Sequence, residues 1–182
     1  MARLDAALAR LRVPLHFVLA AVLLVFAEPS PALLLAGSLV VAAGLAVRAW
    51  AAGYLDKEGT LTVTGPYAYV RHPLYLGTAI VLVGFALAGG RAGLALAVAL
   101  YFVVLFVPAM RREAKERQEK APEVYRDYAV AVPALVPRLR RFPQPGGTAG
   151  FQAQLYRRNR EWRAAAGGAA LLTLLYLKMV WG

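Results

Sequence analysis

The fold can be predicted from residues 73–110, PLYLGTAIVLVGFALAGGRAGLALAVALYFVVLFVPAM. This stretch contains one charged residue, Arg91, which divides it into charge-free runs of 18 and 19 residues. About 20 consecutive apolar residues are enough for an α-helix to cross the hydrocarbon core of a bilayer. The stretch therefore predicts two membrane-spanning helices joined by a very short connection.

Further charge-free runs lie on both sides of this hairpin. Residues 13–27 and 29–47 supply 15 and 19 residues before it, and residues 164–177 supply 14 after it. The last run reaches Trp181 if Lys178 snorkels to the far membrane interface. We therefore predict an all-α polytopic membrane protein with about five transmembrane helices.

The short connections also predict how the helices pack. The first predicted helix should lie antiparallel against the second, and the third against the fourth. Small residues recur at near-helical spacing in the second and third runs and allow close approach of helices. These residues are Gly37, Gly44, Gly77, Gly84 and Ala88.

The composition excludes several classes of protein. The chain of 182 residues is 60% hydrophobic and 17% charged, whereas a soluble domain is usually about 45–50% apolar and about 25% charged. The net charge of +11 does not indicate a nucleic-acid partner, because nucleic-acid binders lack several apolar stretches of membrane length. The absence of cysteine excludes disulfides and thiol chemistry, and two histidines, His16 and His72, leave little for a metal site.

The basic residues predict the topology. Of the 21 Lys and Arg residues, 19 fall on one side of the membrane if successive connections alternate between sides. The positive-inside rule places the amino terminus, the loop 48–73 and the segment 110–163 in the cytoplasm. We expect an integral protein of a bacterial cytoplasmic membrane with its site facing the cytoplasm. His16 is expected to be buried within the first helix, and Arg48 to be a snorkelling anchor.

Two units are expected along the chain. Residues 1–142 form the membrane core, and residues 143–182 form a linker, an amphipathic helix and the fifth span. The linker prediction rests on residues 143–147, PQPGG, which combine helix breakers with backbone freedom. Phe151, Leu155 and Trp162, surrounded by arginines, favour an interfacial helix before the last span.

The first candidate for chemistry is the stretch 64–77, TGPYAYVRHPLYLG. Pro73 can begin the third helix, which places Arg71 and His72 at its amino end. Unpaired backbone amides and the helix dipole favour an anionic group there. Single residues of these types are also common interfacial anchors. Their concentration within fourteen residues favours a binding site.

The second candidate is the stretch 111–120, RREAKERQEK, where the fourth helix leaves the membrane. Glu113 and Glu116 are three residues apart and lie on one helical face, so they could hold an ammonium group. The alternative is a solvated helix in which these carboxylates pair with Arg112, Arg117 and Lys120.

Together these motifs resemble the isoprenylcysteine carboxyl methyltransferase and integral-membrane phospholipid methyltransferase families. The resemblance rests on GPY at 65–67, RHPLYLG at 71–77, Glu113 and YRDY at 125–128, and it covers roughly residues 57–139. It implies methyl transfer from cytoplasmic S-adenosylmethionine to a lipophilic acceptor that arrives from the bilayer. The cofactor pocket would lie between the loop before the third helix and the segment after the fourth.

The chemistry of S-adenosylmethionine suggests roles for these residues. Arg71 or His72 suits its carboxylate, Glu113 its ammonium, and tyrosine rings its sulfonium. A carboxylate acceptor could be positioned by Arg126 or Arg138, whereas an amine acceptor would need a Tyr or Glu base. The candidate cofactor-binding residues are Tyr67, Arg71, His72, Tyr75, Gly77, Glu113, Glu116, Tyr125 and Tyr128.

Two alternative functions stay open at this point. The sequence around RHPLYLG is also similar to the carboxy-terminal part of NADPH-dependent membrane sterol reductases, although Thr78 stands where those enzymes often carry an acid. The chain could also be a non-catalytic membrane subunit that retains a nucleotide-shaped pocket. The acceptor and the oligomeric state are not specified by these patterns.

Overall fold

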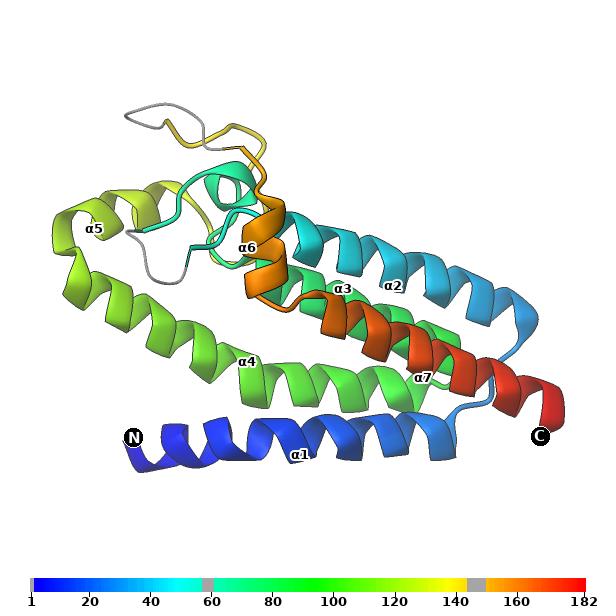
Figure 1. Ribbon diagram of the computed structural model, residues 1–182. Helices are drawn as coiled ribbons and strands as arrows, with labels where there is room; N and C mark the ends of the chain where they lie inside the picture. The colour runs from blue at the N-terminus through cyan, green and yellow to red at the C-terminus, as the bar shows by residue number, and fades with distance from the viewer. Residues whose placement is uncertain (1, 57–60, 144–149) are drawn as a thin grey trace.

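The protein is built of helices (Figure 1). The computed structural model describes residues 2–56, 61–143 and 150–182, and these ranges contain no β-strand. The predicted all-α class is confirmed, whereas most of the predicted linker 143–147 lies outside the described residues. The elements are α1 (Ala2–Phe26), α2 (Pro31–Ala52), the 3₁₀ helix η1 (Gly65–Ala68), α3 (Pro73–Gly89), α4 (Ala92–Lys120), α5 (Pro122–Ala131), α6 (Ala153–Arg158) and α7 (Trp162–Trp181).

Five of these helices carry the apolar runs. By length and composition α2, α4 and α7 can each cross a membrane, and α3 and the Pro14–Phe26 part of α1 are shorter apolar helices. The five lie alongside one another in Figure 1. Large apolar side chains such as Phe17, Leu35 and Leu96 are more than 60% exposed on the outside of this bundle. Such exposure fits a hydrocarbon surrounding, in which apolar side chains need no cover.

The helix ends follow from local sequence. Ser30 caps α2 by accepting a hydrogen bond from the backbone N–H of Leu33, and Pro31 occupies the first helical position. Pro73 begins α3, as predicted. Gly90 ends α3 at φ +73°, a left-handed conformation that glycine adopts without strain.

The most extensive helix contact is between α2 and α3, and small residues form it. A Cβ atom on Gly44 would lie 2.8 Å from the carbonyl oxygen of Gly77, and a Cβ on Gly84 would lie 2.8 Å from that of Gly37. The two backbones therefore approach too closely for any side chain at these positions. The predicted role of the small residues in close helix approach is confirmed.

One predicted pairing is wrong. The first helix does not pack mainly against the second, because α1 makes its largest contact with α4, and α2 with α3. A short connection reverses the chain but does not decide which helix faces meet. Here the matched small residues bring α2 onto α3, and α7 packs chiefly against α2 while also contacting α1 and α3. Leu23, Val41, Phe85, Val98 and Leu175 meet in the resulting core.

The predicted pair of the third and fourth helices does form, but with a much smaller contact. An apolar pocket of about 560 Å³ lies between α3 and α4, and it extends from Arg91 in the connection between these helices to Phe102 and Ala79. Ala79 is one helical turn after Tyr75, so one end of this pocket lies near the first turn of α3.

We predict that Gly44→Ala destabilises the protein by about 1–3 kcal/mol, the usual cost of forcing extra atoms into a packed interface. The added methyl would lie 2.7 Å from the backbone nitrogen of Val81. Unfolding in detergent measures the effect. Gly167→Ala in α7 is the matched control, because a Cβ there meets nothing within 4 Å. Equal stability of the two variants would contradict the packing account.

Candidate functional site

The loop before α3 and the segment after α5 are joined by backbone hydrogen bonds. The N–H groups of Arg71 and His72 donate to the carbonyls of Pro133 and Ala134, at 2.8 and 3.1 Å. In the opposite direction, the N–H of Arg138 donates to the carbonyl of Tyr69 at 2.9 Å. These bonds hold the residues that precede α3 against the segment that follows α5. The loop that ends at His72 is therefore fixed by residues 133–138, which follow α5.

Two buried tyrosines hold the loop before α3 in place. Tyr128 is fully buried, and its hydroxyl donates a 2.6 Å hydrogen bond to the backbone carbonyl of Tyr67. Tyr67 is itself buried in η1. Burial raises the pKa of both phenols, so both hydroxyls are neutral at physiological pH. Tyr128 thus fixes the position of the loop as an uncharged donor.

Glu113 is the centre of the polar cluster. It lies beyond the charge-free run 92–110, where α4 has left the apolar region. The Tyr75 hydroxyl donates a hydrogen bond to its Oε1, and its Oε2 lies 3.7 Å from both His72 Nδ1 and Arg117 Nη2. Burial raises the pKa of this carboxyl, but the contact with His72, the hydrogen bond from Tyr75 and the charge of Arg117 outweigh burial. The pKa of Glu113 is therefore lowered, and the group is ionised at neutral pH.

Aromatic rings form one wall of the cluster. The His72 ring is 4% exposed, and its centroid lies 5.6 Å from that of Tyr75. Tyr75 in turn makes an edge contact with Phe106 at 5.6 Å, and Phe106 stacks on Phe102 at 5.1 Å. This series of rings leads from the polar cluster to the apolar pocket between α3 and α4.

Arg71 lies at the amino end of α3 beside the cluster. Its Nη1 donates a 3.4 Å hydrogen bond to the hydroxyl of Tyr125, which is buried. Its Nε atom is also buried and has no hydrogen-bond partner within the described part of the chain. A buried donor without a partner costs free energy unless an acceptor is supplied. The guanidinium therefore offers a donor for a bound anionic group.

The structure brings most of the predicted residues together but leaves four apart. Glu116 is exposed and pairs with Arg112 at 3.6 Å on the outer face of α4. The exposed Arg126 lies 3.7 Å from its neighbour Asp127. Arg138 donates to the carbonyl of Ala131 at 2.7 Å and so caps α5. Gly77 packs against α2, because a Cβ atom on Gly77 would lie 2.6 Å from Arg48 Cγ.

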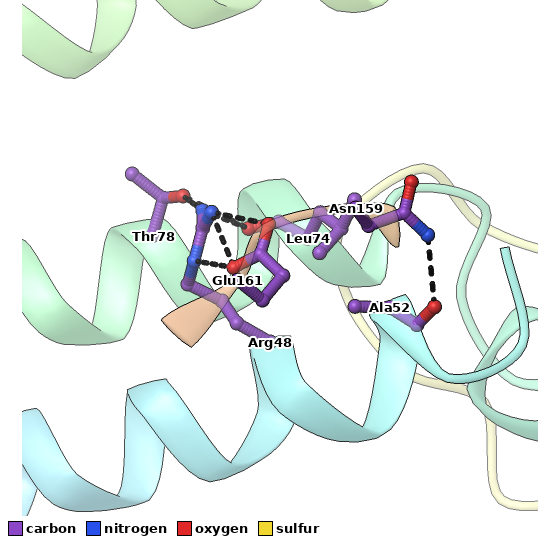
Figure 2. A network of polar contacts seen from close by, with 6 residues as sticks. All are labelled: Arg48, Ala52, Leu74, Thr78, Asn159 and Glu161. Carbon is purple, nitrogen blue, oxygen red and sulfur yellow. Dashed lines mark hydrogen bonds and ion pairs between the residues drawn. The ribbon is translucent and has the colours of Figure 1, made fainter. Parts of the chain in front are cut away.

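The contact between Arg117 and Glu113 is one of the i,i+4 pairs that the solvated-helix alternative predicted. The contacts of Arg48 escaped the sequence prediction. Arg48 was expected to be a snorkelling anchor, which is wrong, because its guanidinium binds Glu161 and the first turn of α3 (Figure 2). The two partners are 113 residues apart, and no local pattern links them. Asn159 donates to the carbonyls of Ala52 and Leu55 in the same region.

His16 and Lys178 lie away from the cluster. The His16 ring makes an edge contact with Tyr101 of α4, with centroids 5.6 Å apart, but His16 is exposed, so the prediction that it is buried is wrong. Lys178 Nζ donates to the carbonyls of Leu24 and Val25 at 2.6 and 2.8 Å. It therefore ties α7 to the end of α1, where the freed carbonyls of a helix accept such donors.

Comparison with known proteins now identifies the central segment. Residues 31–117 match the sequence model of the phospholipid methyltransferase family. The match covers just under half of the chain, and this segment is similar to that family. This segment runs from the start of α2 to Arg117 on α4 and includes His72, Tyr75 and Glu113. The resemblance predicted from the sequence is confirmed, while α5, α6 and α7 lie outside the matched segment.

Two curated relatives are also similar. The chain is 36% identical to the nickel-cobalt-cadmium resistance protein NccN of Alcaligenes xylosoxydans xylosoxydans over 115 residues, which is 62% of this chain and 54% of that protein. It is 33% identical over 112 residues to the cobalt-zinc-cadmium resistance protein CzcN of Cupriavidus metallidurans, covering 60% of this chain and 51% of that protein. The chain thus spans about half the length of these relatives. No solved structure matches it.

We predict that Tyr128→Phe lowers the free energy of unfolding by about 1–3 kcal/mol, because the buried carbonyl of Tyr67 loses its hydroxyl donor. Chemical unfolding in detergent measures the change. Tyr176→Phe on α7 is the control, since that side chain is half exposed. A Tyr128→Phe variant as stable as the control would show that this hydrogen bond does not hold the loop.

Proposed function

We propose that this chain is an integral-membrane methyltransferase that binds S-adenosylmethionine at the Glu113 cluster and methylates a lipophilic acceptor. The observation that carries the proposal is the state of Glu113. An ionised carboxylate with a lowered pKa is surrounded by Tyr75, His72 and Arg117, and it lies within the segment that matches a methyltransferase family. Perturbed titratable groups of this kind concentrate at functional sites.

The residues present fit the chemical groups of this cofactor. Its carboxylate suits the guanidinium of Arg71, whose Nε has no partner in the described part of the chain, and the positive end of the α3 dipole. Its ammonium suits Glu113, whose side chain is one-third exposed and thus accessible to a cation. The rings of His72 and Tyr75 offer aromatic surface beside Glu113, which favours a positively charged sulfonium.

The work of the protein in this reaction is binding and orientation. S-adenosylmethionine supplies an activated methyl group, which passes to the acceptor as the sulfonium becomes a neutral thioether. Tyr75 and His72 contact the Glu113 carboxylate and so orient it. Such a displacement chiefly requires that donor and acceptor be aligned.

The surroundings of the cluster support a lipophilic acceptor. The apolar pocket between α3 and α4 begins at Ala79 and Phe102, and the ring of Phe106 connects it to Tyr75. A hydrocarbon chain in this pocket would have its polar end directed toward the cluster. We also propose that this end of the bundle faces the cytoplasm of a bacterial cell, since 19 of the 21 Lys and Arg residues can lie on that side.

Ligand titration tests the proposed cofactor. Purified protein in detergent should bind S-adenosylmethionine in a calorimetric titration and should not bind NADPH. Glu113→Gln should weaken the first affinity at least tenfold, about 1.4 kcal/mol, because the ammonium loses its ionised partner. Glu119→Gln is the matched control, since Glu119 is an exposed residue of the same helix paired with Lys115. Binding of NADPH alone would favour the reductase alternative and refute the proposal.

A further inference from the structure

Arg48 connects three parts of the chain through one guanidinium. Its Nη2 lies 2.9 and 2.8 Å from the two carboxylate oxygens of Glu161, and its Nε donates to Oε2 at 3.1 Å. Its Nη1 donates to the carbonyl of Leu74 at 3.3 Å and to the hydroxyl of Thr78. Figure 2 shows this guanidinium with Thr78 on one side and with Glu161 and Leu74 on the other.

The ion pair is well shielded from solvent. The Arg48 side chain is 22% exposed and that of Glu161 11%. A bidentate pair of this kind has a defined geometry, unlike a mobile surface pair. Removing either partner leaves a charge with reduced access to water, so the pair is costly to break. The Arg48 guanidinium therefore fixes the positions of Glu161, Leu74 and Thr78 relative to one another.

The partners on α3 flank a residue of the proposed site. Leu74 and Thr78 are four residues apart and lie on one face of α3, directed toward α2. Tyr75 follows Leu74 and faces α4, where it donates to Glu113. Arg48 thus contacts the first turn of α3 from α2, while Glu113 contacts Tyr75 in the same turn from α4. A shift of this turn would move the Tyr75 hydroxyl relative to the carboxylate.

Glu161 comes from outside the family segment. It precedes α7, and Asn159 two residues earlier binds the carbonyls of Ala52 and Leu55 at the end of α2. Burial is the main cause of the raised pKa of Tyr67, and the negative charges of Glu113 and Glu161 raise it further. The segment that carries Glu161 therefore lies against the same end of the bundle as the proposed site.

We propose that Arg48 and Glu161 are positioning residues for Tyr75. Their ion pair sets the first turn of α3 so that the Tyr75 hydroxyl meets Glu113, and it makes the carboxy-terminal segment a part of the site. This inference rests on the proposed binding of S-adenosylmethionine. It assigns a role in that binding to a residue that the family match does not include.

Thr78→Val is the most direct test, because it removes a contact between Arg48 and α3 while leaving the ion pair in place. We expect at least tenfold weaker binding of S-adenosylmethionine in a calorimetric titration, with the unfolding temperature nearly unchanged. The matched control is Arg158→Gln, which breaks a half-exposed 3.9 Å pair with Asp56. That pair joins the same two segments of the chain, so its loss should leave the affinity unchanged.

A double-mutant cycle separates positioning from general stabilisation. Glu161→Gln and Tyr75→Phe should each weaken binding, and the double variant should lose little more than the weaker binder of the two. Residues that act through one another give such non-additive effects, whereas independent contributions add. Fully additive losses would overturn the inference.

Hydrogen exchange of the ligand-free protein gives a readout that needs no cofactor. The backbone amide of Leu76 donates to the carbonyl of His72 at 3.0 Å and closes the first turn of α3. Glu161→Gln should accelerate exchange in this turn and leave exchange at the outer end of α3 unchanged.

The outcomes distinguish the two proposals. If the unmodified protein does not bind S-adenosylmethionine, the proposed function fails. If it binds, but Thr78→Val and Glu161→Gln bind equally well and exchange at the same rate, the positioning role is overturned while the proposed function stands.

Discussion

The backbones of α2 and α3 approach so closely that no side chain fits between them, and the positions of the polar residues at the site depend on this contact. Gly44 and Gly77 place the two helices so close that a single methyl group at either would collide with the other helix. This closeness brings the Arg48 side chain alongside the first turn of α3, where it reaches Leu74 and Thr78. Tyr75 of the same turn contacts Glu113 of α4.

The polar cluster is assembled from elements that the apolar bundle has already aligned. Glu113 reaches Tyr75 and His72 only because α4 continues as a helix beyond the apolar run that packs in the bundle. On the other side, Tyr128 of α5 holds the loop that ends at His72. A carboxylate surrounded by three donors stays ionised although partly buried, and this is the electrostatic property that suits a cationic ligand.

Local patterns were sufficient to predict much of this arrangement. Charge-free runs located the apolar helices, and Pro73 marked the beginning of α3 because proline suits a first helical turn. The stretches around His72 and Glu113 stand out by composition, and the structure brings them together. Each of these features is encoded within about twenty residues of sequence.

Other features depend on contacts between distant residues and were not predictable in this way. The pairing of α1 with α4 depends on which helix surfaces fit, and the length of a connection does not encode that. Glu113 and Glu116 share a helical face in the sequence pattern, yet only Glu113 faces α3. Arg48 and Glu161 are each unremarkable alone, and their ion pair exists only because α6 and α7 fold back onto the end of α2.

Transfer of a labelled methyl group would show directly whether this protein is a methyltransferase. Protein in lipid vesicles would be incubated with methyl-labelled S-adenosylmethionine and a bacterial lipid extract, and the label would be measured in the lipid fraction. We predict label in lipid with the unmodified protein and little or none with Glu113→Ala. Label absent from lipid with the folded, unmodified protein, or equal label with Glu113→Ala, would contradict this prediction.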